Sequence, residues 1–275
     1  MKSSKKLIIN ADDYGACARV NQAVEQLLLA GRLRSVSVMA NGSNWASAVD
    51  FLRDHPTPSV GVHLNAVEGQ PISNAPQARR LIDNQGSFVG LRRLLTRWSL
   101  DPAGVYRAVE LEWRAQIERL QRAGVRLTHA DSHRHLHAFP LAYPIAVKLC
   151  HEYGIAALRW PCECGTWKVR RTGTVGLNAS LFITKSLIRR TGLRHNNYFL
   201  GFTRAGGYGI EELMKDLRTI PAGVTEIALH PSMTDGYPYP NLHGNRERLA
   251  LLRDDLPAWI KQLGIELTTW EDITT

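Results

Sequence analysis

The sequence predicts a single α/β domain folded as a (β/α) barrel, TIM-like, closed or nearly closed, with some distortion allowed. Short runs rich in β-branched residues alternate about seven times with longer stretches in which apolar residues follow helical spacing. This alternation is typical of a mainly parallel sheet with helical crossovers, and the number of repeats favours a barrel over an open sheet. The 275 residues, of which 44% are hydrophobic, suffice for one large core.

The elements are predicted in chain order from these runs. The predicted strands are apolar segments bounded by turn residues, at 6–11, 35–41, 59–65, 127–133, 155–161, 196–202, 224–231 and 265–270. The predicted helices are amphipathic segments between them, at 20–31, 44–55, 91–123, 141–154, 210–220 and 246–264. The stretch from about 162 to 200 is the least regular, and we interpret it as an insertion over one end of the barrel, within a single domain of residues 1–275.

Composition and charge narrow the class of protein. No run of about 18 uncharged apolar residues is present, so we expect no integral membrane segment, and acids interrupt the charged start too early for a secretory signal. The cytoplasm is therefore the expected compartment. The formal charge of +9 comes from scattered basic residues without a nucleic-acid module, so we expect solvated helix faces and no nucleic-acid partner. The charge leaves room for a polyanionic or membrane-associated substrate.

Potential ligand side chains gather where the predicted strands end. Chemistry in such barrels sits at the carboxyl ends of the strands, so residues there are expected to share one site. The polar residues at these ends are Asp12, Asp13, Asn41, His63, Asp131, His133, His135, His137 and His230. Random placement of ten histidines would rarely put so many at one face.

An aspartate with two histidines from separate strands is a common set for a divalent ion with open positions for water and substrate. The H-x-H-x-H run should place His133, His135 and His137 on one side of an extended segment. Not all three need bind the ion, because one of them can contact the ion-binding side chains or the substrate instead. If Asp13 binds the ion, Asp12 can lie beside the attacking water and accept its proton. A helix N-cap would explain one of these aspartates and leave the other unexplained.

Four motifs in order connect the chain to a known family. They are NADDYG at 10–15, GVHLNAVEGQPI at 61–72, THADSHRHLH at 128–137 and LHP at 229–231. With them the chain resembles, over nearly its whole length, the YdjC-like carbohydrate deacetylases, a group that includes the chitooligosaccharide deacetylase and the hopanoid-biosynthesis-associated deacetylase.

The resemblance implies a barrel related to the polysaccharide deacetylases and a divalent ion held by Asp13, His63 and His133. It also implies Asp12 as the base acting on water, hydrolysis of the acetamide of an N-acetylated amino sugar, and a homodimer. The resemblance points to magnesium, whereas the ligand types equally suit zinc or another transition metal. The proton donor to the leaving amine is expected to be His230, with His137 as the competitor, because either imidazole titrates in a useful range.

The substrate and the reaction class retain alternatives. GLRHNNYFLGF and IPAGVTEIALHP look like the hopanoid-associated branch, and DSHRHLH like the general carbohydrate branch, so lipid-linked and soluble N-acetylated sugars both stay open. A metal-dependent phosphoesterase would use similar clusters, with Asp131, His135 and the AGGYG of 205–209 as its candidate residues. A catalytically inactive protein that binds carbohydrate or nucleic acid would be expected to lack Asp12, which is present.

Overall fold

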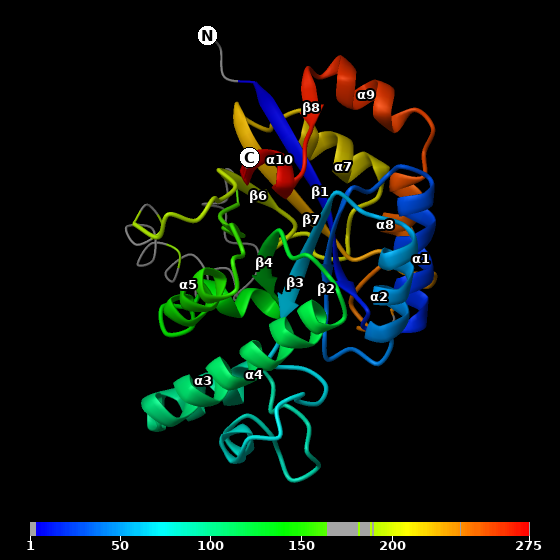
Figure 1. Ribbon diagram of the computed structural model, residues 1–275. Helices are drawn as coiled ribbons and strands as arrows, with labels where there is room; N and C mark the ends of the chain where they lie inside the picture. The colour runs from blue at the N-terminus through cyan, green and yellow to red at the C-terminus, as the bar shows by residue number, and fades with distance from the viewer. Residues whose placement is uncertain (1–3, 164–180, 182–187, 189, 237, 275) are drawn as a thin grey trace.

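A curled parallel sheet forms the centre of the protein (Figure 1). The computed structural model describes residues 4–163, 181, 188, 190–236 and 238–274. The strands are β1 (Lys5–Tyr14), β2 (Ser35–Val38), β3 (Ser59–Leu64), β4 (His129–Ser132), β5 (Ala157–Leu158), β6 (Tyr198–Leu200), β7 (Gly223–Leu229) and β8 (Ile265–Leu267). The helices are α1 (Ala18–Leu29), α2 (Trp45–Asp54), α3 (Leu91–Leu100), α4 (Pro102–Arg122), α5 (Tyr143–Glu152), α7 (Ile210–Leu217), α8 (Gly244–Leu251), α9 (Leu256–Gln262) and α10 (Trp270–Thr274), with 3-10 turns η1 (Pro76–Arg80) and η2 (His133–Ala138).

The strand order is β5-β4-β3-β2-β1-β7-β6, and every pairing along it is parallel. β8 lies off this path and pairs with the first residues of β1. Among the described residues, the β5 and β6 sides meet through isolated bridges, Ala157 with Arg194 and Glu163 with Phe199. The predicted parallel barrel is therefore confirmed as a curled half-barrel whose closure is incomplete.

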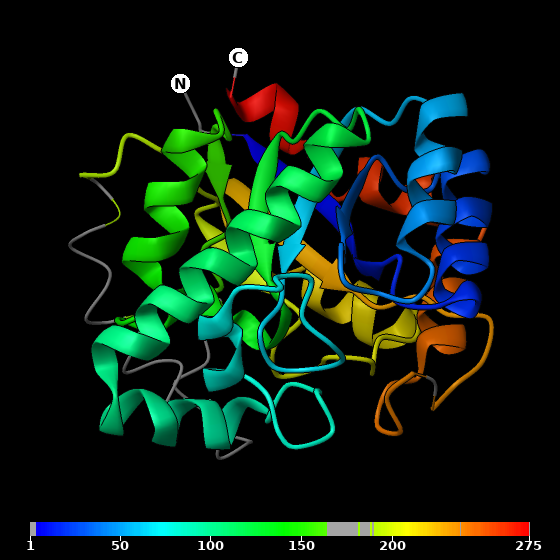
Figure 2. The ribbon, with the colours of Figure 1, turned by 60° about the horizontal axis from the view of Figure 1, so that its bottom comes forward.

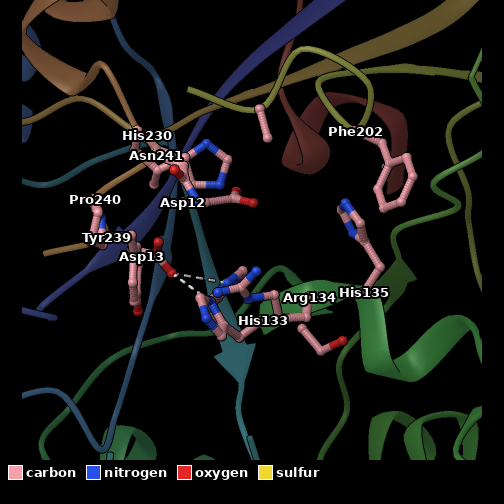
Figure 3. Close-up of a pocket in the computed structure, with 14 residues that line it drawn as sticks. Asp12, Asp13, His133, Arg134, His135, Phe202, His230, Tyr239, Pro240 and Asn241 are labelled. Atoms are coloured by element: carbon pink, nitrogen blue, oxygen red, sulfur yellow. Dashed lines mark hydrogen bonds and ion pairs between the residues drawn. The ribbon is translucent and has the colours of Figure 1, made fainter. Parts of the chain in front are cut away.

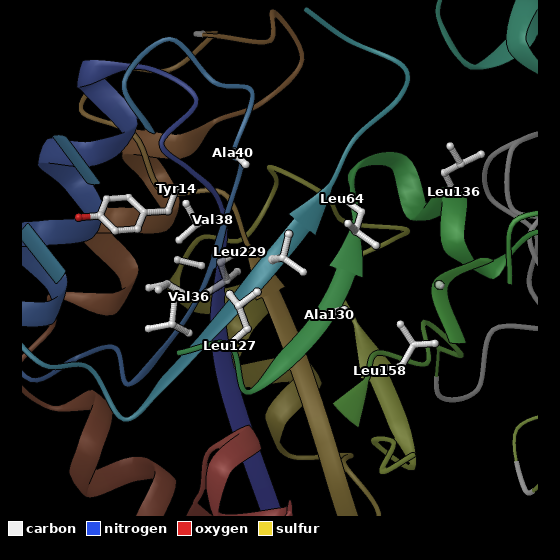
Figure 4. Packing of buried hydrophobic residues seen from close by; sticks show 14 of the residues in the cluster. Tyr14, Val36, Val38, Ala40, Leu64, Leu127, Ala130, Leu136, Leu158 and Leu229 are labelled. Atoms are coloured by element: carbon white, nitrogen blue, oxygen red, sulfur yellow. The ribbon is translucent and has the colours of Figure 1, made fainter. Parts of the chain in front are cut away.

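Helices cover the outside of the sheet, with α1 between α2 and α8 on one flank and α4 packed against α3 and α5 on another (Figures 1 and 2). Alternation along each strand divides its side chains between two environments. On β1, Ile9 and Ala11 join the main hydrophobic core, whereas Asn10 and Asp12 join a buried polar layer. Figure 4 shows the apolar side of this arrangement, with Leu64 of β3 among the apolar side chains of neighbouring strands.

Two predicted elements differ at the carboxyl-terminal end of the described chain. The predicted helix 246–264 is two helices, because the chain turns after α8 and α9 begins anew at Leu256. Pro257 lies in the first turn of α9, where a backbone amide hydrogen would have no partner within the helix. The predicted strand 265–270 stops after three residues, because Thr269 and Asp272 cap α10 reciprocally, through 2.8 and 3.2 Å bonds to each other's backbone N–H. The predicted insertion at 162–200 falls largely outside the described residues.

Candidate active site

Asp12 and Asp13 both face one pocket although they are neighbours on β1. Side chains of consecutive strand residues normally point to opposite faces. Here the register between β1 and β2 shifts between Ala11 and Tyr14, and Asp13 takes the left-handed conformation with φ of 61°. This bulge re-aims the strand end, so two adjacent carboxylates can line the same cavity.

Asp13 meets two histidines from the ends of other strands. Oδ1 of Asp13 lies 3.2 Å from Nε2 of His63, on β3, and 3.0 Å from Nδ1 of His133, directly after β4. Figure 3 shows Asp13 directed toward His133 across the pocket. The other Asp13 oxygen, Oδ2, is buried and has no hydrogen-bond partner among the described residues. The three side chains thus offer ligand atoms within 4.8 Å of one another.

A carboxylate stands behind each of these histidines. Nδ1 of His63 lies 2.7 Å from Oδ1 of Asp131, and Nε2 of His133 lies 3.1 Å from Oε2 of Glu68. Burial alone would lower the pKa of His63, but Asp131 and Asp13 outweigh it and raise that pKa well above its ordinary value. Burial would likewise raise the pKa of Asp13, but His133 and His63 hold it well below its ordinary value. The carboxylates around His63 and His133 therefore stabilise positive charge next to the Asp13 carboxylate.

Asp12 is held by a buried arginine, Arg159, that is not among the site residues predicted from the sequence. Arg159, just after β5, places Nη1 2.7 Å from Oδ2 and Nη2 2.8 Å from Oδ1 of Asp12. Its Nη2 also lies 2.7 Å from carboxylate oxygens of Asp131 and Glu226. Burial raises the pKa of Glu226 to about 7, although Arg159 opposes that shift. The sequence does contain an indication of this pair, because Arg159 and Glu226 are the single charged residues in the apolar runs IAALRWP and VTEIALHP. A charge in a buried strand needs a partner.

The histidine run does not continue as a strand, so the predicted extended arrangement is wrong. β4 ends at Ser132, and η2 follows with Arg134 and His135 in the left-handed conformation, at φ of 56° and 52°. His135 consequently lines the pocket, with its ring 5.5 Å from that of Phe202. His137 instead turns into the interior, where its Nδ1 lies 2.6 Å from the Ser132 hydroxyl and its Nε2 lies 3.0 Å from the Arg159 carbonyl oxygen.

His230, which follows β7, completes the set of predicted residues at the pocket. Its Nδ1 is buried without a hydrogen-bond partner in the described part of the chain, and burial lowers the pKa of its imidazole. Of the two predicted proton donors, His230 lines the pocket, whereas His137 is fully buried with both ring nitrogens engaged.

The pocket has a volume of about 860 Å³, which is within the usual range for small-molecule sites. Aromatic and apolar groups lie among the polar ones, with Phe202 near His135 on one side of the pocket and Tyr239 and Pro240 near Asp13 on the other (Figure 3). Its lining residues are Asp12, Asp13, His63, Ser132, His133, Arg134, His135, Phe202, Ala205, His230, Tyr239, Pro240, Asn241 and Leu242. Such a cavity can hold a polar ligand with an apolar face.

Solved structures share the fold. A proposed cellobiose-phosphate cleavage protein of Enterococcus faecalis V583 superposes with a TM-score of 0.78 at 24% identity, covering 99% of this chain and 100% of that one. A mutant CE4 family pseudoenzyme with restored enzymatic activity superposes with a TM-score of 0.51 at 10% identity, covering 100% of this chain and 69% of that one. The chain thus shares its fold with these two structures, one of which is a CE4 family protein.

Sequence comparison identifies the family. A carbohydrate deacetylase of Brevibacillus brevis is 31% identical over 273 residues, covering 98% of this chain and 99% of the relative. A carbohydrate deacetylase of Homo sapiens is 29% identical over 301 residues, covering 98% of this chain and 91% of the relative. The family profile described as YdjC-like protein matches residues 6–262. The chain therefore belongs to the YdjC-like family, as its four motifs predicted.

Proposed function

We propose that this chain is a metal-dependent hydrolase that removes the acetyl group from an N-acetylated amino sugar. The observation that carries the proposal is the convergence of His63 and His133 on Asp13, beside Asp12, in the wall of a ligand-sized pocket. The homologous relatives are carbohydrate deacetylases, which supports a sugar as the substrate class.

The residues around Asp13 fit a divalent ion. Two imidazoles and a carboxylate form a donor set typical of such ions, and the buried, unpartnered Oδ2 of Asp13 is a polar atom that an ion would satisfy. Asp13, His63 and His133 would hold it, and a bound ion would act as a Lewis acid toward the acetamide carbonyl. Magnesium, zinc and other transition metals remain candidates for the resident ion.

Asp12 is the proposed base. Both its oxygens accept hydrogen bonds from Arg159, and Oδ1 also accepts one from Asn10 at 2.7 Å, so the carboxylate is fixed in orientation. A carboxylate has about four acceptor positions, which leaves capacity for a water in the pocket. Asp12 takes a proton from that water as its oxygen attacks the carbonyl carbon. The C–N bond then breaks and gives acetate and the free amine.

The leaving amine needs a proton, and His230 is the proposed donor. Burial lowers the pKa of its imidazole, so His230 is neutral at rest and must first receive a proton. Asp12 lines the same pocket and would supply the proton taken from water. This order returns both residues to their starting states after each turnover.

Substitution of His230 and of His137 should separate these two candidates. His230→Gln is expected to lower kcat by about 100-fold or more, because a positioned proton donor is lost. His137→Gln should keep kcat but lower the free energy of unfolding by about 1–3 kcal/mol, because the buried partners at Ser132 and Arg159 lose hydrogen bonds. Turnover assays and urea unfolding of both variants give the comparison, and the opposite pattern would assign the donor role to His137.

The phosphoesterase alternative would require a second ion, for which Asp12, His63 and Asp131 form the available group. The Arg159 guanidinium lies within 2.8 Å of both of those aspartates. A fixed positive charge at this position disfavours a second cation. The deacetylase reaction, which needs one ion, fits the charges better.

The decisive test is acetate release from monomeric, oligomeric and lipid-linked N-acetylhexosamines. The protein is stripped with a chelator and supplied with one divalent ion at a time. Acetate is expected only when an ion is restored, and the most reactive substrate decides between soluble and lipid-linked sugars. Stoichiometric ion binding without acetate from any of these substrates would count against the proposed reaction while leaving the ion site intact.

A further inference from the structure

His63 and His133 turn opposite ring nitrogens toward Asp13. His63 presents Nε2 and bonds through Nδ1 to Asp131, whereas His133 presents Nδ1, and its Nε2 lies 3.1 Å from Oε2 of Glu68 in an ion pair without hydrogen-bond alignment. Asp131 is fully buried, but Glu68 lies in the loop after β3, with 28% of its side chain exposed. We infer that Glu68 is a positioning residue that sets the proton position and orientation of His133 for ion binding. The inference rests on the metal-dependent function proposed above.

Hydrogen bonds from neighbouring asparagines fix the backbone of Glu68 within its loop. Oδ1 of Asn65 accepts the Glu68 backbone N–H at 3.2 Å, and Nδ2 of Asn65 donates to the Glu68 carbonyl oxygen at 2.7 Å. Asn41, after β2, donates to the same carbonyl oxygen at 3.3 Å. Glu68 is thus connected to the ends of two strands of the barrel, and it is a defined part of the site despite its exposure.

The carboxylate of Glu68 is oriented as well. Nε of Arg134 donates to Oε1 at 2.9 Å and Nη2 of Arg134 reaches the same oxygen, which leaves Oε2 directed at His133. Arg134 adopts the left-handed conformation, so the strained turn after β4 brings its guanidinium back over the β3 loop. The ring of Tyr239 lies 5.2 Å from that of His133 and restricts its rotation from the pocket side.

This arrangement has a definite chemical consequence for His133. A neutral imidazole carries one proton, and the negative charge of Glu68, 3.1 Å from Nε2, favours that proton on Nε2, which leaves the lone pair of Nδ1 directed at the Asp13 position. The negative charge of Glu68 also makes Nδ1 a stronger donor to a cation. Without Glu68 the proton can move to Nδ1 and block it, and the ring can turn. The alternative role, an anchor for Arg134 alone, would affect the loop but not the nitrogen chosen by an ion.

Glu68→Gln tests this role, because glutamine keeps the size of the side chain and loses its charge. The matched control is Glu212→Gln. Glu212 also pairs with an arginine, Arg246, and has 27% of its side chain exposed, but its hydrogen bonds are to Arg246 and the Gly209 backbone N–H, not to His63 or His133. The dissociation constant of Zn²⁺ is measured by calorimetry on the full chain for wild type and both variants, with thermal unfolding as the check on folding. Imidazole ¹⁵N shifts of the Zn²⁺-loaded proteins report which nitrogen of His133 binds the ion.

Glu68→Gln is expected to raise the Zn²⁺ dissociation constant by about 10- to 100-fold, and Glu212→Gln to leave it unchanged. The wild-type ¹⁵N spectrum should show the ion on Nδ1 and the proton on Nε2 of His133. Equal affinity in wild type and Glu68→Gln, or an ion on Nε2 of His133 in wild type, would overturn the role of Glu68 while leaving the ion site standing. A wild-type chain that binds no divalent ion would overturn the ion site itself, and this inference with it.

Discussion

Asp12→Asn is expected to lower kcat by about 10²- to 10⁴-fold while ion affinity stays at the wild-type value. Asparagine has the shape of aspartate and can still accept a hydrogen bond from Arg159, but it cannot take a proton from water. Asp12 is not one of the side chains that converge on Asp13, so the ligand set is unchanged. Acetate release under saturating substrate, together with calorimetric ion titration, measures the two quantities separately.

Asp13→Asn is the control for this prediction. It removes the charge on which His63 and His133 converge, so ion affinity and turnover should fall together. A kcat of Asp12→Asn near that of wild type would remove Asp12 from the role of base. Loss of ion binding in Asp12→Asn would instead show that the two adjacent carboxylates both serve the ion.

Arg159→Met should produce the largest loss of stability, about 3–5 kcal/mol, because it leaves buried carboxylates without their cation. The guanidinium is fully buried and bonds to Asp12, Asp131 and Glu226. Unpaired buried carboxyls have raised pKa values in the folded state, so they stabilise it while protonated and cease to do so as pH rises. The deficit of Arg159→Met relative to wild type should therefore grow between about pH 4 and 7.

Urea unfolding at several pH values measures that deficit. Arg246→Met is a suitable control, since Arg246 pairs with Glu212 with 48% of its side chain exposed, and such a pair contributes about 0–1 kcal/mol. A loss for Arg159→Met as small as that of the control would mean that water or rearrangement neutralises the carboxylates.

Local pattern predicted the order and type of most elements. The runs at 6–11 and 59–65 become β1 and β3, because apolar β-branched residues pack on a helix-covered sheet. The helix predicted at 246–264 is interrupted, since its apolar spacing continues through a turn that Pro257 follows. Incomplete closure between the β5 and β6 sides depends on long-range pairing, which no local pattern reports.

The part of the candidate site that lies at strand ends could be predicted from the sequence. Asp12, Asp13, His63, His133 and His230 do meet at one pocket, because parallel strands deliver their ends to one edge. The orientation of His135 and His137 could not be predicted, because it follows from the left-handed backbone of Arg134 and His135. Residues other than glycine rarely adopt that conformation, so no sequence pattern indicates it. The roles of Arg159 and Glu68 depend on partners from distant parts of the chain.

The buried arginine also has a consequence for how the protein folds. Arg159 is separated from Asp12 by 147 positions and from Glu226 by 67, so neither contact can form early from a local nucleus. Parallel strand pairing adds further long-range contacts, and topologies of this kind fold slowly. Until these segments meet, the polar layer lacks its compensating charges, so intermediates should keep the centre of the sheet hydrated. Asp12, the proposed base, is then among the last groups to become ordered, and recovery of activity during refolding should lag behind recovery of helical circular dichroism.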